Sequence, residues 1–433
     1  MKMGAWEVVG ILISLTALSS VINYRFLKLP KSIGLTIITL LLSLFLACFG
    51  KLGWNVDGYA EQLLDGIGFT NTFLHGMLGF LIFAASLHVN ARELAKYKLI
   101  VGLLATVTVV LSTFLIGIST YGLTRFLNID IPLEYCFVFG ALISPTDPIA
   151  TLSILKTLKA PKALEMKIAG EALFNDGMGI VLFIILFGVA TGSEVNWDLK
   201  NITFFLMQQG LGGLCLGMVM GWLAACLLRR IDNYEVAIIL TLALVTGGYT
   251  FAHEVMQVSG AICMAVSGLI VGSSLQKGNM SKDTMSRLDA FWELLDGILN
   301  AMLFVLIGLE FLCLHFSFDT TLAAIGAIMI TMIARWISVV IPVGWVGLFR
   351  KFGPNAVLMM TWGGLRGGIS IALALTVPQG AIRDFILSIT YAVVLFSITI
   401  QSFTLHSIAQ HITRRSGSHK NSTRLDYATN ANA

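Results

Sequence analysis

The chain has 433 residues, of which 56% are hydrophobic and 12% are charged, and its mean hydropathy is +0.85. Soluble domains carry about 25% charged residues, so this composition excludes an ordinary soluble protein and indicates a polytopic membrane protein. The formal net charge of +4 does not suggest a nucleic-acid partner.

Thirteen apolar stretches are long enough to cross a hydrocarbon core of about 30 Å, which takes roughly 20 residues per helix. No sizeable polar segment separates them, so we expect one all-α transmembrane domain over residues 1–413 and a short polar cytoplasmic tail over 414–433. The predicted spans are 5–24, 32–50, 69–88, 99–124, 135–155, 168–190, 202–228, 235–252, 258–275, 291–314, 321–349, 355–377 and 384–406.

The distribution of Lys and Arg predicts the orientation of these spans. If the N-terminus lies outside, 21 of the 28 basic residues fall in the inner loops and the tail, and five fall outside. Because basic residues collect on the cytoplasmic side, this split predicts an outer N-terminus and an inner C-terminus. The odd number of spans also fits an inverted repeat, with spans 1–6 and 8–13 as the two halves and span 7 as the linker.

Two spans at matching positions in these halves are interrupted. Span 5 contains residues 144–148 (SPTDP), and span 12 contains residues 363–368 (GGLRGG). Proline removes a backbone donor and glycine lowers the cost of unwinding, so each stretch is expected to break its helix near mid-membrane. The two breaks carry charges of opposite sign, Asp147 and Arg366.

The residues of the breaks suggest particular roles. Asp147 suits the cap of a half-helix, where the helix dipole favours a negative charge. Thr146 and the carbonyls freed by Pro148 offer oxygen ligands to a monovalent cation, so Asp147 is expected to support the ion without carrying it. Arg366 is expected to face the carbonyl ends of the broken helices and to offset the charge of Asp147.

Span 6 carries two acids in the stretch 170–177 (GEALFNDG). Glu171 and Asp176 are five residues apart, which places them about 140° apart around a helix, so they cannot both face one partner. Arg335 in span 11 is the candidate partner of Glu171. Counting Asp147 and Arg366 as well, three acids stand against two arginines, and Asp176 is the acid left without a partner.

An unpaired carboxylate inside a membrane is costly and marks ion routes. Asp176 can be neutralised by a proton or by a metal cation, and the two compete for one charge, which is the chemistry of an antiporter. The alternative is a protonated acid that is hydrogen-bonded in a polar core.

These motifs resemble the NhaP-type branch of the sodium/proton antiporter family, which is shared with eukaryotic sodium/hydrogen exchangers. The matching stretches are 144–152 (SPTDPIATL), 171–183 (EALFNDGMGIVLF), 363–368 (GGLRGG) and Arg335 in span 11. The resemblance covers nearly the whole chain. It implies a homodimer in the cell membrane, in which an ion-carrying bundle moves against a dimer-forming bundle.

The resemblance also implies roles for individual residues. Asp176 is then the acid that binds the cation and the proton, Asn175 is its structural neighbour, and Thr146 is a backbone ligand at the crossing. Glu171 and Arg335 form a stabilising ion pair, and Arg366 supplies a charge near the second crossing.

We therefore expect a secondary transporter, not an enzyme, that exchanges Na⁺ or Li⁺ for H⁺ by alternating access and needs no cofactor. One exchangeable carboxylate implies an electroneutral exchange. Relatives often carry Ser at the position of Ala172, and some carry an acid in the stretch 83–88 (FAASLH), so a K⁺/H⁺ exchanger of the same fold stays open. A cation channel is a further alternative, although the sequence has no repeated filter-like loop.

Overall fold

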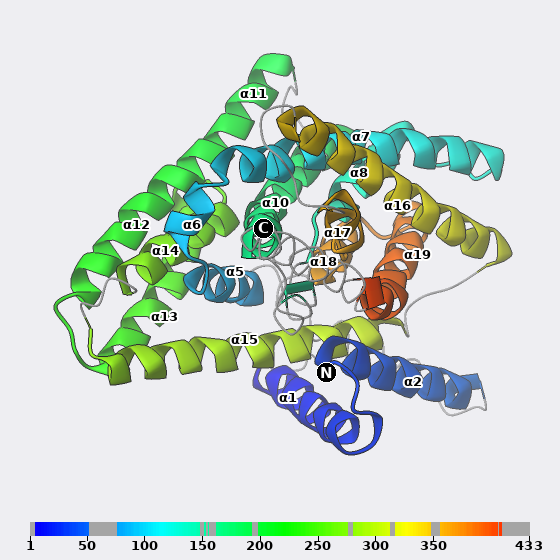
Figure 1. The fold of residues 1–433 in the computed structure, drawn as a ribbon. Coiled ribbons are helices and arrows are strands. Elements are labelled where there is room, and N and C mark those ends of the chain that lie inside the picture. Colours follow the sequence, from blue (N-terminus) through cyan, green and yellow to red (C-terminus); the bar gives the residue numbers. More distant parts are fainter. Residues whose placement is uncertain are drawn as a thin grey trace, which may run out of the picture.

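A computed structural model describes residues 5–51, 76–147, 151–152, 155, 162–192, 198–275, 280–311, 317–347, 356–405 and 407–408. The predicted tail 414–433 lies outside these ranges, and so do parts of the third and fifth predicted spans (69–75, 148–150 and 153–154) and the ends of the last four (312–314, 348–349, 355 and 406). Figure 1 shows the arrangement of the helices.

The described part of the chain is helical, apart from connecting loops and one isolated β-bridge. The N-terminal half contains α1 (Ala5–Ile22), the π-helical turn η1 (Asn23–Leu27), α2 (Lys31–Lys51), α5 (Leu78–Leu87), α6 (Ala91–Ala95), α7 (Lys98–Phe126), α8 (Leu133–Ile143) and α10 (Lys162–Ala190). The C-terminal half contains α11 (Leu199–Met207), η3 (Gln208–Gly212), α12 (Gly213–Leu228), α13 (Tyr234–Thr250), η4 (Phe251–Val255), α14 (Gly260–Leu275), α15 (Lys282–Glu310), α16 (Phe318–Gly347), α17 (Ala356–Trp362), α18 (Gly368–Ala374), α19 (Ala381–Phe396) and η6 (Ser397–Gln401).

Many of these helices are long and apolar enough to cross a membrane. Within the described ranges there are eight such stretches: Val9–Leu27, Lys98–Phe126, Lys162–Ala190, Lys200–Leu228, Tyr234–Val255, Lys282–Glu310, Phe318–Trp345 and Ala381–Leu405. Shorter apolar helices over Lys31–Leu46, Leu78–Leu87, Leu133–Ile143 and Gly260–Leu275 lie at further predicted spans. The predicted all-α, multi-pass membrane architecture is confirmed, while the number of thirteen spans and the orientation stay predictions.

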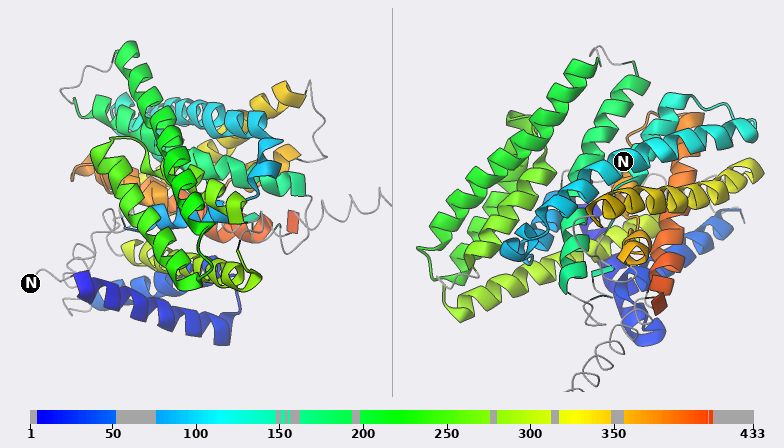
Figure 2. Two further views of the ribbon diagram at one scale, coloured as in Figure 1. Left: turned by 90° about the vertical axis from the view of Figure 1, so that its left-hand side faces the viewer. Right: turned by 45° about the horizontal axis from the view of Figure 1, so that its top comes forward.

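Helix α10 lies near the centre of the bundle in Figure 1 and packs against α7, α8 and α14. The paired helices α12 and α14 cover one side, and α7 and α16 pack against each other on another side. The hairpin of α1 and α2 packs against α15 at the edge of the molecule, and the turned views of Figure 2 show the same arrangement. The middle of α10 is therefore enclosed by other helices.

Small residues allow α12 and α14 to approach closely. Gly213, Gly217 and Gly221 lie four residues apart on one face of α12, and a Cβ added at any of them would meet the α14 side of the contact within 2.8 Å. Ser267 of α14 also donates a hydrogen bond to the carbonyl of Gly217 at 3.0 Å. Glycine faces of this kind favour close helix packing inside membranes, where water does not drive association.

A buried tryptophan joins three helices on the same side of the bundle. Trp292 of α15 is fully buried, and its ring centre lies 4.8 Å from that of Phe83 in α5. Its indole nitrogen donates to the hydroxyl of Thr241 in α13 at 3.1 Å. The polar atom of a large apolar side chain is thereby satisfied, so the ring fills the core without an unpaired donor.

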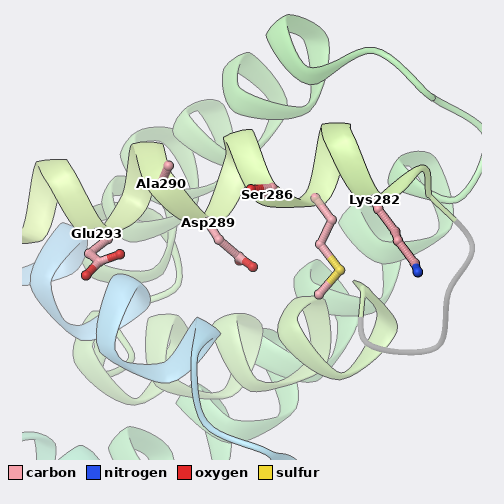
Figure 3. A pocket seen from close by; sticks show the side chains of 6 residues that line it. Lys282, Ser286, Asp289, Ala290 and Glu293 are labelled. Carbon is pink, nitrogen blue, oxygen red and sulfur yellow. The ribbon is translucent and has the colours of Figure 1, made fainter.

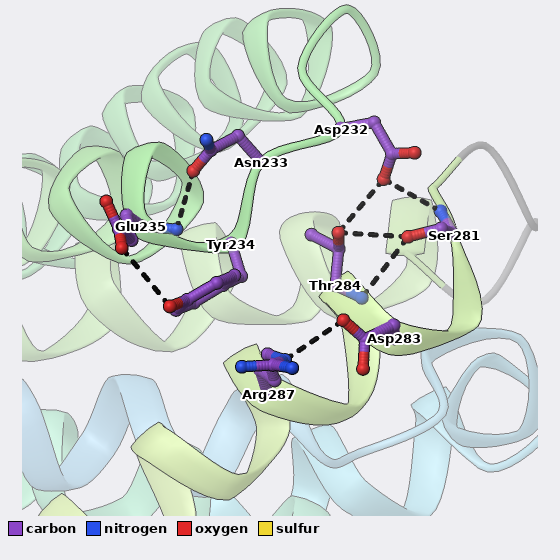
Figure 4. A network of polar contacts seen from close by, with 8 residues as sticks. All are labelled: Asp232, Asn233, Tyr234, Glu235, Ser281, Asp283, Thr284 and Arg287. Carbon is purple, nitrogen blue, oxygen red and sulfur yellow. Dashed lines mark hydrogen bonds and ion pairs between the residues drawn. The ribbon is translucent and has the colours of Figure 1, made fainter.

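The start of α15 is fixed by a polar network outside the apolar region (Figure 4). Ser281 caps the helix by accepting from the backbone N–H of Thr284 at 3.2 Å. Asp232, in the loop between α12 and α13, accepts from the N–H of Ser281 at 3.1 Å and from the hydroxyl of Thr284 at 3.0 Å. These bonds lower the pKa of Asp232, chiefly through Ser281, and they tie the α12–α13 loop to α15.

Candidate functional site

The polar residues of α10 differ sharply in their surroundings. Glu171 and Asn175 are buried, with exposed fractions of 2% and 0%, whereas Asp176 is partly exposed. Glu171 and Asn175 share a helix face because they are four residues apart, and Asp176 points elsewhere. The structure thus separates the two acids of the motif, as their spacing predicts.

The chain leaves the helical conformation after α8 and between α17 and α18, and the two breaks lie against each other. The N–H of Asp147 donates to the carbonyl of Leu365 at 2.7 Å, which forms the isolated antiparallel bridge of the fold. The hydroxyl of Thr151 donates to the carbonyl of Gly363 at 2.8 Å. Backbone groups freed by one break are therefore satisfied by the other, as buried polar groups require.

Arg366 fastens the two breaks together from the side of α18. Its Nη1 donates to the carbonyls of Ser144 at 2.7 Å and Pro145 at 3.0 Å, just beyond the C-terminal end of α8. A cation is favourable there because the carbonyl end of a helix is negative. This placement is the one expected for Arg366 toward a broken helix, while its compensation of Asp147 stays a prediction.

A second set of polar groups holds the backbone of Arg366. Its N–H donates to the hydroxyl of Ser397 at 2.8 Å, and Ser397 donates to the side chain of Gln401 at 2.9 Å. Gln401 in turn donates to the carbonyl of Trp362 at 2.8 Å. The sequence reasoning did not single out Ser397 or Gln401, although a glutamine within an apolar span was an available signal.

Glu171 forms an ion pair with Arg335 of α16, with 2.5 Å between Oε1 and Nη1. Both side chains are almost fully buried, and Arg335 also donates through Nη2 to the carbonyl of Met360 at 3.1 Å. Burial of either charge alone would be costly, and the pairing reduces that cost. Arg335, the partner expected for Glu171 from its place within span 11, is thus the residue that Glu171 contacts.

The amide of Asn175 reaches across to the first break. Its Nδ2 donates to the hydroxyl of Thr146 at 2.7 Å, and both residues are buried. Its Oδ1 is buried and has no hydrogen-bond partner among the described residues. A buried amide oxygen without a hydrogen bond can coordinate a cation.

The carboxylate of Asp176 has neither a hydrogen bond nor an ion pair within the described part of the structure. Its electrostatic neighbour is Asp147, whose carboxylate lies against the backbone of Gly367. The two carboxylates together with the Asn175 amide make a region rich in oxygen ligands. Oxygen ligands suit hard cations, and a carboxylate in a desolvated site can take up a proton instead.

The described residues contain no group of three or more His, Cys, Asp or Glu side chains that could hold a resident metal ion. Glu310 flanks predicted span 10 at its end, where the sequence predicts a solvated or interfacial side chain. That prediction is wrong, because Glu310 is buried with 6% of its surface exposed.

Comparisons with known proteins give matches over most of the chain. A family model described as sodium/hydrogen exchanger, transmembrane, matches residues 11–411. The Na⁺/H⁺ antiporter NhaP of Pseudomonas aeruginosa is 40% identical over 411 residues, which cover 94% of this chain and 96% of that protein. The Na⁺/H⁺ antiporter NhaH of Halobacillus dabanensis is 33% identical, covering 90% of this chain and 93% of its own length.

Among solved structures, that of the sodium proton antiporter MjNhaP1 from Methanocaldococcus jannaschii at pH 8 superimposes with a TM-score of 0.73. The match covers 95% of this chain and 99% of that chain at 20% sequence identity. At this identity the likeness shows that the two chains share a fold.

Proposed function

Because this chain belongs to the sodium/hydrogen exchanger family, we propose that it exchanges Na⁺, or Li⁺, for H⁺ across the cell membrane. The observation that carries the proposal is the state of Asp176, a partly exposed carboxylate within the helical bundle that has no partner among the described residues. Such a group binds a cation or a proton, and it cannot hold both charges at once.

The neighbouring residues complete the ion site. The free Oδ1 of Asn175 and the oxygens around Thr146 and Asp147 at the first break act as further ligands of the dehydrated cation. The hydrogen bond from Asn175 to Thr146 keeps α10 in register with that break. Thr146 supplies a ligand from the first break, and Asp176 supplies one from α10 on the other side of the site.

The two arginines balance the other charges. Arg335 is committed to Glu171, and Arg366 to the carbonyls at the end of α8. With Asp147 and Asp176 counted, the charged residues of the site carry one net negative charge, which one Na⁺ or one H⁺ neutralises. One proton is therefore exchanged for one monovalent cation, and the exchange is electroneutral.

The site operates by alternating access in a fold of thirteen spans, with the N-terminus outside and the C-terminus inside. Spans 1–6 and 8–13 form the inverted repeat, and span 7 links them. The crossing of the two breaks supports this arrangement, because ion sites in such transporters lie where broken helices meet. The transporter acts as a homodimer, in which the bundle around α10 moves against the bundle that joins the two copies.

The proposal is tested with purified protein in proteoliposomes that contain a pH-sensitive dye. A Na⁺ pulse should change the internal pH for the wild type and should leave it unchanged for Asp176→Asn. Asp130→Asn is the matched control, because the side chain of Asp130 is 92% exposed and its loss should leave transport intact. Thermal unfolding of each variant confirms that the protein is folded.

Pulses of Li⁺ and K⁺ in the same assay determine which cation the protein exchanges for H⁺. A response to K⁺ alone would replace the proposal with K⁺/H⁺ exchange, for which the absence of a side-chain oxygen at Ala172 is the relevant feature. A membrane potential that builds up during transport would exclude electroneutral exchange. Full transport by Asp176→Asn would refute the role of this carboxylate.

A further inference from the structure

A groove with a volume of about 1250 Å³ lies between the hairpin of α1 and α2 and part of α15, away from the ion site. One face of α1 lines it through Ile13, Thr16, Ala17 and Ser20, which follow the i, i+3, i+4, i+7 spacing of a single helix face. The opposite wall is α15. The groove is lined mainly by apolar surface along its length, and basic side chains gather at one end.

The basic end consists of Arg25, Lys28 and Lys31, which all line the groove and are exposed. They lie in and beside the turn between α1 and α2. Glu293 is the acid among the lining residues, so the groove carries two net positive charges. An anionic group therefore finds a favourable potential at this end.

The turn that carries these basic residues is held in one conformation. Buried Asn23 donates to the carbonyl of Leu29 at 3.0 Å and accepts from the N–H of Leu29 at 3.2 Å. Lys28 has a left-handed backbone, with φ of 52°, and its N–H donates to the carbonyl of Asn23 at 2.7 Å. The three charges are therefore presented together at a fixed place.

Two exposed aromatic residues, Tyr24 (84% exposed) and Phe26 (75% exposed), flank Arg25 in this turn. Aromatic rings beside basic residues are typical of the level of the lipid headgroups. From Arg25 back to Ile13 the wall of α1 extends twelve residues, or about 18 Å. This length is close to half of a hydrocarbon core of about 30 Å, which is the depth of one lipid leaflet.

The wall of α15 is open at Gly297, where an added Cβ would meet no other atom within 4 Å. Glycine in the interior of a helix costs roughly 0.5–1 kcal/mol relative to alanine. Here no neighbouring protein atom requires the small residue, although it widens the groove. Space for a bound acyl chain would explain why a glycine is useful at this position.

We propose that the groove binds one phospholipid with an anionic headgroup. The phosphate lies against Arg25, Lys28 and Lys31, and an acyl chain lies between α1 and α15 past Gly297. A neighbouring hollow of about 420 Å³ on α15 is a poor site for such a headgroup, because the carboxylates of Asp289 and Glu293 line it, with Lys282 at its far end (Figure 3).

Native mass spectrometry of the full-length protein tests the proposal. The protein is reconstituted in vesicles with equal parts of phosphatidylglycerol, phosphatidylethanolamine and phosphatidylcholine and is then released into mild detergent. The wild type should retain phosphatidylglycerol at least about fivefold over the other two lipids, which is the effect of a single basic residue at a membrane surface. The triple variant Arg25→Gln, Lys28→Gln, Lys31→Gln should lose this preference.

The matched control removes three exposed basic residues elsewhere, by the substitutions Arg92→Gln, Lys96→Gln and Lys98→Gln. It should keep the preference of the wild type. Gly297→Leu should lower the retention of all three lipids, because Gly297 lines the groove and has open space at its Cβ position, so a leucine there occupies part of the groove. This variant separates occupation of the groove from general attraction of anionic lipid to a basic surface.

Several outcomes would overturn the proposal. One is equal retention of the three lipids by the wild type, and another is equal loss of preference in the triple variant and its control. A third is unchanged lipid retention by Gly297→Leu. A last outcome is that the wild type is a dimer without bound lipid and that Gly297→Leu dissociates this dimer. It would show that a second copy of the chain covers the groove instead.

Discussion

The amide of Asn175 donates a hydrogen bond of 2.7 Å to the hydroxyl of Thr146, and this bond joins α10 to the break that follows α8. It lies beside Asp176, so it connects the carboxylate proposed to carry the ion with the segment proposed to supply the remaining ligands. This contact between two buried residues links α10 directly to the first break, which Arg366 also holds through the carbonyls of Ser144 and Pro145.

Thr146→Val removes the hydroxyl from this contact with little change in volume. We expect an apparent affinity for Na⁺ about tenfold weaker, because the buried Asn175 amide loses its acceptor and its register with the break. The measurement is the Na⁺ dependence of exchange in proteoliposomes. Thr146→Ser keeps the hydroxyl and should remain close to the wild type. Equal affinities for all three proteins would show that the contact does not position the site.

Exchange should depend on pH through competition at Asp176. Protons and cations neutralise the same carboxylate, so the apparent affinity for Na⁺ weakens as pH falls. Where the site is mostly protonated, the apparent KM for Na⁺ should rise about tenfold for each unit by which the pH falls, because each bound cation displaces one proton. Initial rates at a series of Na⁺ concentrations and pH values give this slope. An apparent KM that does not change with pH, or that changes about a hundredfold per pH unit, contradicts one-for-one competition.

The ion pair between Glu171 and Arg335 should matter more for stability than for ion binding. Glu171→Gln leaves a buried arginine charge unpaired, and breaking a buried pair in this way costs about 3–5 kcal/mol. The double variant Glu171→Gln, Arg335→Met removes both charges and should recover part of that loss. Thermal unfolding in detergent compares the three proteins. A double variant that is less stable than Glu171→Gln would contradict this account.

Parts of this site could be predicted from the sequence because they follow from helix geometry and charge alone. The spacing of Glu171 and Asp176 fixes their relative directions, the position of Arg335 within span 11 makes it the candidate partner of Glu171, and the count of charges leaves Asp176 without one. The partners of Arg366 at Ser397 and Gln401 could not be derived in this way. They depend on how η6, which continues α19, packs beside the second break, and the pattern of apolar residues carries no information on that packing. Glu310 shows the same limit, because helix ends can be buried by neighbours distant in sequence.

Gly367 is expected to be essential because the carboxylate of Asp147 lies against it. An added Cβ would lie 2.8 Å from Oδ2 of Asp147, so Gly367→Ala should displace that carboxylate and reduce exchange at least tenfold. Gly344→Ala is the control, since a Cβ at Gly344 in α16 meets nothing within 4 Å. Both variants are compared by proteoliposome exchange and by thermal unfolding. Normal exchange in Gly367→Ala would mean that Asp147 can shift without consequence.

The network at the start of α15 should be sensitive to the charge of Asp232. Hydrogen bonds from Ser281 and Thr284 lower the pKa of Asp232 in the folded protein below the ordinary value of 3.8. A lowered folded pKa means that the stabilisation is fully present above the unfolded pKa and is lost as pH falls through the folded pKa. Asp232→Ala should therefore weaken the first turn of α15 at neutral pH, and the difference from the wild type should shrink only below about pH 4.

Hydrogen exchange of the amides over residues 281–285, compared between variants at each pH, measures this effect. Asp283→Ala is the control, because Asp283 contacts Arg287 in the same turn but does not bind the α12–α13 loop. Equal exchange rates for the two variants at neutral pH would show that Asp232 does not anchor the helix.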